Sequence, residues 1–337
     1  MPSPRTNITE ITTGLATLGY QSLDRALEVR PRHISHVDDL VFDNLEAARA
    51  SGNFDEEFNI AWSNGWTFAR SDQGLRGRPP WHLEWKGPHK PASRSIETIP
   101  ADLRIDHVYL ISCKYGSEIL HNSSPVVLFD RCLAPTTERA SQVDWYETVA
   151  PEPYRQLWEP ILNQSLTRPP RSPLEASKDQ RNSIKAYLKA NPVDTKSPAY
   201  CAFVDDVSNQ TARRWQQSIG NLAGQREMIW RLLRLQGAPY YLLGADKQSK
   251  PLRYRVETPW DFNQRYVVNG LNITAGNRGQ PAVNWTASIT SNESAVEHLV
   301  EGFVEIRWSH GKLNGPPEAK VHLSTNPHRV PGYQPIE

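Results

Sequence analysis

The last third of the chain alternates between apolar and polar residues with a period of two, and this pattern limits the folds open to it. Five short runs follow one another from Pro251 onward: PLRYRVE, RYVVNGLNIT, AVNWTASIT, VEGFVEIRW and AKVHL. Glycine, asparagine and proline separate the runs, which is typical of short strands joined by turns. We therefore expect a C-terminal antiparallel β-domain, built as a sandwich or a barrel.

The preceding part of the chain mixes helical and strand patterns. Apolar residues recur at helical spacing over 37–50 and 56–68. Further helices are expected over 144–166, 178–190, 208–219 and 225–235, and strands over 81–86, 103–115, 200–204 and 239–243. The run 103–115 is apolar on both faces, as a central buried strand is. We predict an α+β protein with an α/β domain over 1–245, which carries helical insertions, and a β-rich recognition or oligomerisation domain over 246–337.

Charge and cysteine content exclude some classes of protein. Lys and Arg number 38 against 37 Asp and Glu, which argues against a protein that simply coats nucleic acid, because such proteins carry a basic excess. No window approaches the roughly 18 apolar residues of a membrane-spanning helix, and we expect no signal peptide. The cysteines, at positions 113, 132 and 201, form no C-x-x-C pair, which favours a reducing, cytoplasmic compartment.

An ordered set of ionisable residues lies in the N-terminal half. Glu57 falls on an expected helix, and Glu84 falls within the strand WHLEWK. Asp102 and Asp106 precede or open the buried strand, and Lys114 lies near its end. Side chains alternate along a strand, so residues 106, 112 and 114 are expected on one face. Clusters of this kind are candidate sites for metal-assisted chemistry.

This order of a helix acid, a strand acid and a buried strand ending in x-x-Lys resembles the core of the PD-(D/E)xK nuclease superfamily over residues 40–120. In that superfamily a helix carries a Glu, and a β-hairpin presents Asp and (D/E)-x-Lys to one or two Mg²⁺ ions. The chain departs from the pattern at Ser112, where the family has Asp or Glu. Asp106 or Asp102 would have to supply the missing acid, and the sequence leaves both open.

The resemblance implies a Mg²⁺-dependent (or Mn²⁺-dependent) DNA endonuclease of the restriction or defence kind. Glu57, Glu84, Asp106 and Asp102 would hold the metal, and Lys114, Glu84 and Asp106 would be the catalytic residues. The metal would neutralise phosphate charge and activate a water, and Lys114 would stabilise developing charge. Cutting both strands favours a homodimer. The alternative is a non-catalytic nucleic-acid-binding or assembly protein with a degenerate nuclease-like fold, which Ser112 favours.

Arginine and aromatic residues interleave between positions 213 and 255. The expected nucleic-acid contacts are Arg213, Arg214, Arg231, Arg234, Arg253 and Arg255. Such a mixture can follow a phosphate backbone and stack on bases, but amphipathic helices with solvated arginines and buried tryptophans explain it equally well. A second E-x-K, Glu318 to Lys320, follows Glu305 and Arg307, and ordinary cross-strand charge pairing accounts for it.

Overall fold

A computed structural model of the protein describes residues 4–87, 99, 101–116, 119–131, 143–309 and 311–337. The chain forms two compact units and passes between them repeatedly. Unit 1 comprises residues 1–118, 234–266 and 326–337, and unit 2 comprises residues 119–233 and 267–325. The single boundary expected near residue 245 falls inside unit 1, at the last residue of a strand.

Unit 1 is built on a mixed seven-stranded sheet with the strand order β1-β2-β3-β4-β6-β7-β12. The strands are β1 (Ile34–Ser35), β2 (Leu83–Trp85), β3 (Leu103–Ile105), β4 (Tyr109–Tyr115), β6 (Tyr240–Ala245), β7 (Pro251–Val256) and β12 (Tyr333–Pro335). Strands β2, β3 and β4 are antiparallel neighbours, whereas β6 runs parallel to β4. The central strand expected over 103–115 is therefore a hairpin, because Asp106 and His107 turn the chain between β3 and β4.

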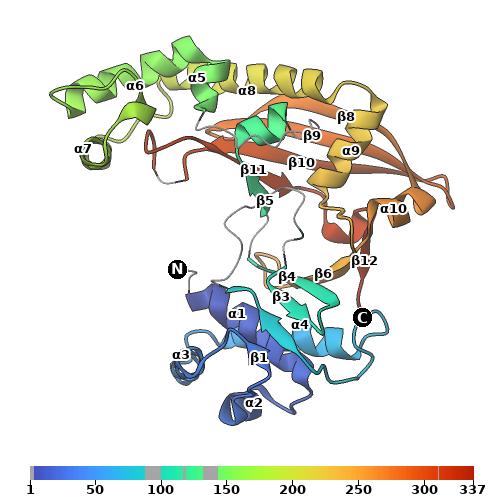
Figure 1. Ribbon diagram of the computed structural model, residues 1–337. Helices are drawn as coiled ribbons and strands as arrows, with labels where there is room; N and C mark the ends of the chain where they lie inside the picture. The colour runs from blue at the N-terminus through green and yellow to red at the C-terminus, as the bar shows by residue number, and fades with distance from the viewer. Residues whose placement is uncertain (1–3, 88–98, 100, 117–118, 132–142, 310) are drawn as a thin grey trace. The chain divides into compact units, whose positions relative to one another are not determined.

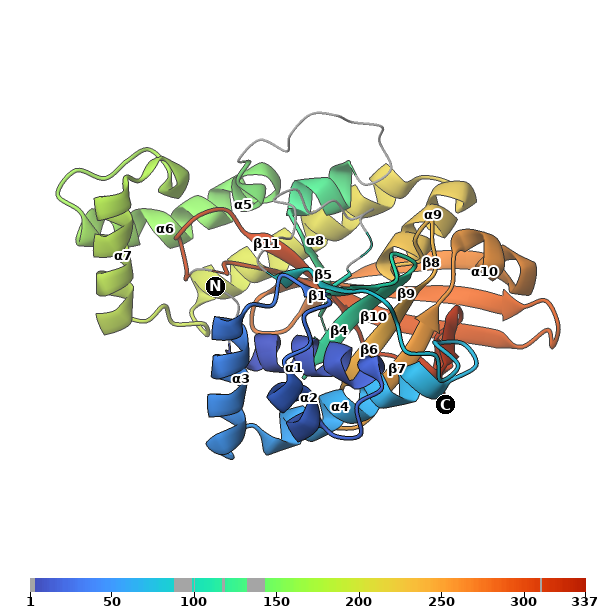
Figure 2. The same cartoon turned by 60° about the horizontal axis from the view of Figure 1, so that its bottom comes forward.

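Helices of unit 1 cover one face of this sheet (Figures 1 and 2). They are α1 (Pro4–Leu15), α2 (Leu23–Val29), α3 (Asp39–Ala50) and α4 (Asp55–Arg70), whereas α10 (Pro259–Arg265), also of unit 1, lies apart from them. Helices α1 and α4 pack closely, because a Cβ added at Gly65 would lie 2.1 Å from the carbonyl oxygen of Thr13. The core beneath them contains Phe58, Phe68 and Ile111, all fully buried. Odd-numbered residues of β4 thus face the helices, and even-numbered residues face the opposite side.

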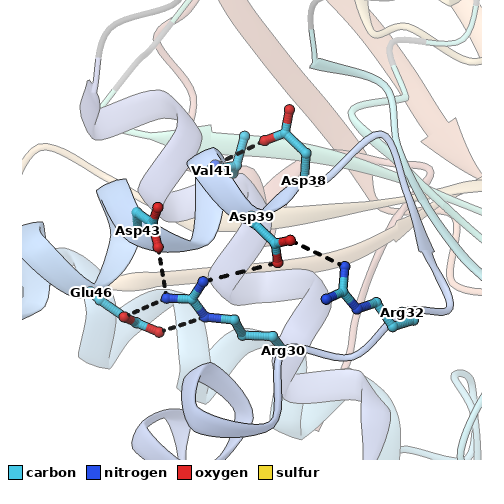
Figure 3. A network of polar contacts seen from close by, with 7 residues as sticks. All are labelled: Arg30, Arg32, Asp38, Asp39, Val41, Asp43 and Glu46. Carbon is cyan, nitrogen blue, oxygen red and sulfur yellow. Dashed lines mark hydrogen bonds and ion pairs between the residues drawn. The ribbon is translucent and has the colours of Figure 1, made fainter.

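An arginine-centred network joins α2 to α3 (Figure 3). Arg30 ends α2 in a left-handed conformation. Its guanidinium donates to both carboxylate oxygens of Glu46, at 3.0 and 2.7 Å, and pairs with Asp43 at 2.8 Å. Asp38 caps α3 by accepting a hydrogen bond from the backbone N–H of Val41. Cap and network together fix the short connection between the two helices.

Unit 2 is built on a five-stranded antiparallel sheet with the order β5-β11-β10-β9-β8. The strands are β5 (Ile119–Ser123), β8 (Tyr266–Asn277), β9 (Pro281–Ser291), β10 (Glu297–Arg307) and β11 (Glu318–Leu323). The helices include α5 (Trp145–Val149), α6 (Pro151–Ser165), α7 (Lys178–Ala190), α8 (Pro198–Ile219) and α9 (Leu222–Leu232). Helix α8 lies across the sheet and packs on β9, where Trp215 and Trp285 are buried (Figure 1).

The structure confirms an α+β fold with an antiparallel sheet formed by four of the five C-terminal runs. The first run, PLRYRVE, instead becomes β7 of unit 1. The strand expected over 200–204 is wrong, because those residues form the first turns of α8 and bury Tyr200, Phe203 and Val204 on a helical stripe. Within the described residues, no helix combines the length and the apolar character needed to cross a membrane.

Candidate functional site

The candidate acidic residues Asp102 and Asp106 lie at opposite ends of β4. In the β3–β4 hairpin, Leu103 pairs with Ile111 and Ile105 pairs with Tyr109. Asp102 precedes β3, so it lies beside the carboxyl end of β4. Asp106 follows β3, so it lies at the amino end of β4.

The carboxyl end of β4 holds a buried carboxylate, a buried hydroxyl and a lysine. Asp102 accepts a 2.6 Å hydrogen bond from the backbone N–H of Cys113. Ser112 is completely buried, and its Oγ has no hydrogen-bond partner in the described part of the chain. Lys114 is half-buried and shares a face of β4 with Ser112. Its ammonium makes no ion pair or hydrogen bond with any residue that the structure describes.

Helix α4 directs Glu57 towards the same end of the sheet. Near its C-terminus, Phe68 packs edge-on against Tyr109, at the amino end of β4. One turn earlier, Asn64 donates to the carbonyl of Gly244 at 2.7 Å and lies 3.3 Å from the hydroxyl of Tyr115, at the carboxyl ends of β6 and β4. Glu57 lies about 10 Å further along the helix axis. Its carboxylate pairs with Arg5 at 2.9 Å.

Glu84 does not join Lys114. In register, Glu84 on β2 lies opposite Arg104 on β3, which lies opposite Leu110 on β4. Lys114 is two strands across and four residues further along, which places the two Cα atoms about 16 Å apart. The buried carboxylate of Glu84 accepts hydrogen bonds from Lys86 at 2.7 Å and Arg104 at 2.6 Å. Burial raises the pKa of Glu84, but these two bonds outweigh it and hold the pKa below its ordinary value.

Asp106 ties the segment before β2 to the β3–β4 turn. One carboxylate oxygen accepts from the backbone N–H groups of Trp81 and His82, at 2.9 and 3.1 Å. The other accepts a 2.5 Å bond from Arg78, which raises the pKa of that arginine. Its carboxylate is therefore already committed to three donors within the fold. The expected metal set is thus divided, with Asp102 and Glu57 towards one end of β4 and Glu84 and Asp106 towards the other.

Two histidines that the sequence analysis did not single out gather around Glu84. One donor atom from each of His82, Glu84 and His107 lies within 4.8 Å of the others. The spacing His-x-Glu was the available signal, because it puts residues 82 and 84 on one face of a strand. Mg²⁺ prefers an all-oxygen shell, which fits the carboxylates and hydroxyl at the carboxyl end better than this nitrogen-rich cluster.

The arginine-rich stretch is divided between the two units. Arg213, Arg214 and Arg231 belong to α8 and α9 of unit 2, whereas Arg234, Arg253 and Arg255 belong to unit 1. Most of these arginines already contact other residues of the chain. Arg214 pairs with Asp130, and Arg231 pairs with Glu227. Arg253 donates hydrogen bonds to Asn64 and Ser63, and Arg234 is buried. Arg213 is exposed and makes no ion pair with the described residues.

A cavity of about 430 Å³ in unit 1 gathers arginines that the sequence analysis did not select. It lies between the C-terminal half of α4 and the loop that follows. Trp66, Arg70, Arg76 and Arg78 contribute to its lining. The guanidinium carbon of Arg70 lies 3.9 Å from the centre of the Trp66 ring. A planar aromatic surface beside several guanidinium groups suits a base and its phosphate.

The second E-x-K of the sequence forms an ordinary cross-strand arrangement. Glu305 lies opposite Lys320, and Arg307 lies opposite Glu318, on the neighbouring strands β10 and β11. Opposite charges thus occupy facing positions, but the ion pairs join residues of one strand, Glu305 with Arg307 at 3.3 Å and Glu318 with Lys320 at 3.6 Å.

Comparison with known proteins identifies no relative. No family model matches the chain, and neither the curated proteins nor the solved structures contain a match to it.

Proposed function

We propose that the protein is a Mg²⁺-dependent DNA endonuclease that hydrolyses phosphodiester bonds at the carboxyl end of β4. The observation that supports this proposal is the open end of the hairpin, where Asp102 lies beside the Ser112 hydroxyl and Lys114, neither of which has a polar partner among the described residues. A buried polar group without a partner costs roughly 1–3 kcal/mol. A water or ion held beside Ser112 would offset that cost.

The residues at this end divide the work between binding and charge stabilisation. Asp102 would supply a carboxylate to the ion, whereas Glu57 lies on the helix-covered side of the sheet, about 10 Å beyond Asn64 along α4, and is too far from Asp102 to share the ion. An ion held there would neutralise phosphate charge and lower the pKa of a bound water. Lys114, which pairs with none of the residues that the structure describes, would contact the phosphate and stabilise the charge that develops there.

Glu84 and Asp106 then have positioning roles. Glu84 joins β2 to β3 through Arg104 and pairs with Lys86 on its own segment. Asp106 fixes the turn at the far end of the hairpin. The catalytic and metal-binding roles that the resemblance implied for these two residues pass, in this proposal, to Asp102 and Lys114.

The test is cleavage of supercoiled plasmid, with and without base modification, in Mg²⁺, in Mn²⁺ and in EDTA. Lys114→Gln and Asp102→Asn should each slow metal-dependent cutting by about 100-fold or more, and Asp102→Asn keeps an oxygen for the N–H of Cys113. Lys189→Gln is the control, because that lysine is exposed on α7 of unit 2. Cutting by Lys114→Gln at the wild-type rate, or no metal-dependent cutting of any substrate, would refute the proposal.

A second candidate function is nucleic-acid binding without catalysis. Ser112 in place of an acid favours it, as does the arginine-lined cavity beside Trp66. A gel shift in EDTA without any cutting in Mg²⁺ would select this reading. Arg70→Gln with Arg76→Gln should then weaken binding and lower its salt dependence, whereas Lys114→Gln should leave it unchanged.

The assembly and the compartment belong to the same proposal. Cutting two strands requires two active sites, which a symmetric homodimer supplies, and sedimentation with and without a DNA duplex tests this. A reducing, cytoplasmic setting agrees with Cys113 and Cys201, which are both free thiols. Exposed Cys201 should react with a maleimide in freshly lysed cells, and its failure to react would argue against that compartment.

A further inference from the structure

We propose that His82, Glu84 and His107 form a binding site for a first-row transition-metal ion such as Zn²⁺, separate from the nuclease site proposed above. Their donor atoms already lie within 4.8 Å of one another. Two ligands on one tetrahedral Zn²⁺ lie roughly 3.3 Å apart. Modest side-chain rotation therefore closes the site, and no backbone movement is needed.

The donor set determines the kind of ion. Two imidazole nitrogens and one carboxylate oxygen suit Zn²⁺, Co²⁺ or Ni²⁺, whereas Mg²⁺ and Ca²⁺ select oxygen. Hydrogen bonds from Lys86 and Arg104 keep Glu84 in the carboxylate form that a metal needs. Glu84 is buried, His82 is half-buried and His107 is exposed, so an ion can enter from the histidine side and leave a position open for an exchangeable ligand.

The backbone holds the two histidines in place before any ion binds. His82 leads into β2, which pairs with β3, so residue 82 lies beside the start of the β3–β4 turn. Asp106 accepts from the N–H of His82, and its own N–H donates to the carbonyl of His82 at 2.9 Å. The two imidazole rings face each other at a tilt of 36°, with centres 4.8 Å apart. Ligands fixed in this way lose little freedom on binding an ion.

The turn places His107 at a positive φ, a backbone conformation that glycine adopts without strain and other residues adopt less often. The N–H of Val108 donates to the carbonyl of Ile105 at 3.0 Å, and both residues between them have positive φ, 49° for Asp106 and 59° for His107. Turns of this kind favour glycine or asparagine at such positions. A role for the side chain would explain why a histidine occupies this position. Glycine would adopt the same backbone conformation but would provide no imidazole.

Two positively charged neighbours of Glu84, Lys86 and Arg104, affect the expected affinity for the metal ion. Glu84 has to share its oxygens between the ion and the charged groups of Lys86 and Arg104. Both positive charges oppose a divalent cation. Removing the Lys86 charge should therefore strengthen metal binding, although that substitution removes no ligand.

The experiment titrates Zn²⁺, Co²⁺ and Mg²⁺ separately into the metal-stripped full chain by calorimetry, with the visible absorbance of Co²⁺ as a second readout. We expect one Zn²⁺ per chain, bound at least tenfold more tightly than Mg²⁺. His107→Gly should weaken Zn²⁺ binding at least tenfold while its melting temperature stays equal or rises, and Lys86→Gln should tighten binding. His328→Gln, an exposed histidine of the same unit, is the matched control and should bind Zn²⁺ as the wild type does.

Two results would overturn the proposal: no uptake of Zn²⁺ by the wild type, or equal Zn²⁺ affinity in the wild type and His107→Gly. Lys114→Gln separates this site from the nuclease site, because that variant should lose cutting and keep Zn²⁺ binding. Loss of Zn²⁺ binding in Lys114→Gln would count against a separate site, whereas intact binding with no nuclease activity would leave it standing.

Discussion

Asp144 in unit 2 gives the structure a measurable dependence on pH. The residue caps α5 and is buried. One of its carboxylate oxygens accepts from the N–H of Tyr146 at 3.0 Å, and the other accepts from the hydroxyl of Tyr154 at 2.9 Å. Burial raises the pKa of Asp144 from 3.8 to about 6, against the lowering effect of those two hydrogen bonds. The native state therefore holds this proton more tightly than the unfolded chain does.

The size of the effect follows from that shift. A rise of roughly two pKa units corresponds to about 3 kcal/mol at 1.36 kcal/mol per unit. The charged carboxylate is the disfavoured form in the fold, so the cost is absent at low pH and appears as the pH rises from about 4 to about 6. Asp144→Asn removes the charge at the expense of one acceptor, worth about 1 kcal/mol. The variant should be slightly less stable than the wild type near pH 4 and about 2 kcal/mol more stable at pH 7.

The assay is hydrogen–deuterium exchange of peptides from α5 and α6 in a denaturant series, because it reports unit 2 by itself. The quantity of interest is the difference in unfolding free energy between Asp144→Asn and the wild type, which should rise by about 2 kcal/mol or more from pH 4 to pH 7. Tyr154→Phe removes a donor that lowers the pKa of Asp144, so the same rise should extend to higher pH. A difference that stays constant with pH would refute the argument.

Two further predictions concern the packing and the charges of unit 1. Gly65→Ala should lower the melting temperature sharply, because its Cβ would lie 2.1 Å from the Thr13 carbonyl oxygen. Gly237→Ala, whose Cβ would have nothing within 4 Å, should leave the melting temperature unchanged. Equal melting temperatures for the two variants would refute the close packing of α1 and α4. Arg30→Gln should lower stability in low salt and lower it less in high salt, because it removes the bonds from α2 to α3. Arg32→Gln, which loses one 3.4 Å contact of an exposed side chain, should cost little in denaturant unfolding.

The sequence predicts the individual helices and strands better than it predicts which strands pair with each other. Helices such as α4 and α7 follow from their apolar spacing, and α7 carries a complete capping box at Ser177. The run 251–256 has the same alternation as the strands of unit 2, yet it pairs with β6 of unit 1. Alternation with a period of two predicts that a segment is a strand, but it does not specify which strand lies next to it. The chain therefore looks like two consecutive domains in sequence, although its contacts make two interleaved ones.

At the candidate site, too, the sequence predicts local features but not which residues come together. Alternation correctly assigns Ser112 and Lys114 to one face of β4, but a face has two ends, and only strand register decides which end a neighbouring residue reaches. Asp102 and Asp106 are four positions apart, and strand β3 between them places one at each end of the hairpin. Glu84 follows Asp106 rather than Lys114 because β2 pairs with β3 in the register Leu83 to Ile105. What looks in sequence like one acidic cluster around a lysine is, in the fold, a lysine with Asp102 at one end and a histidine–carboxylate group at the other.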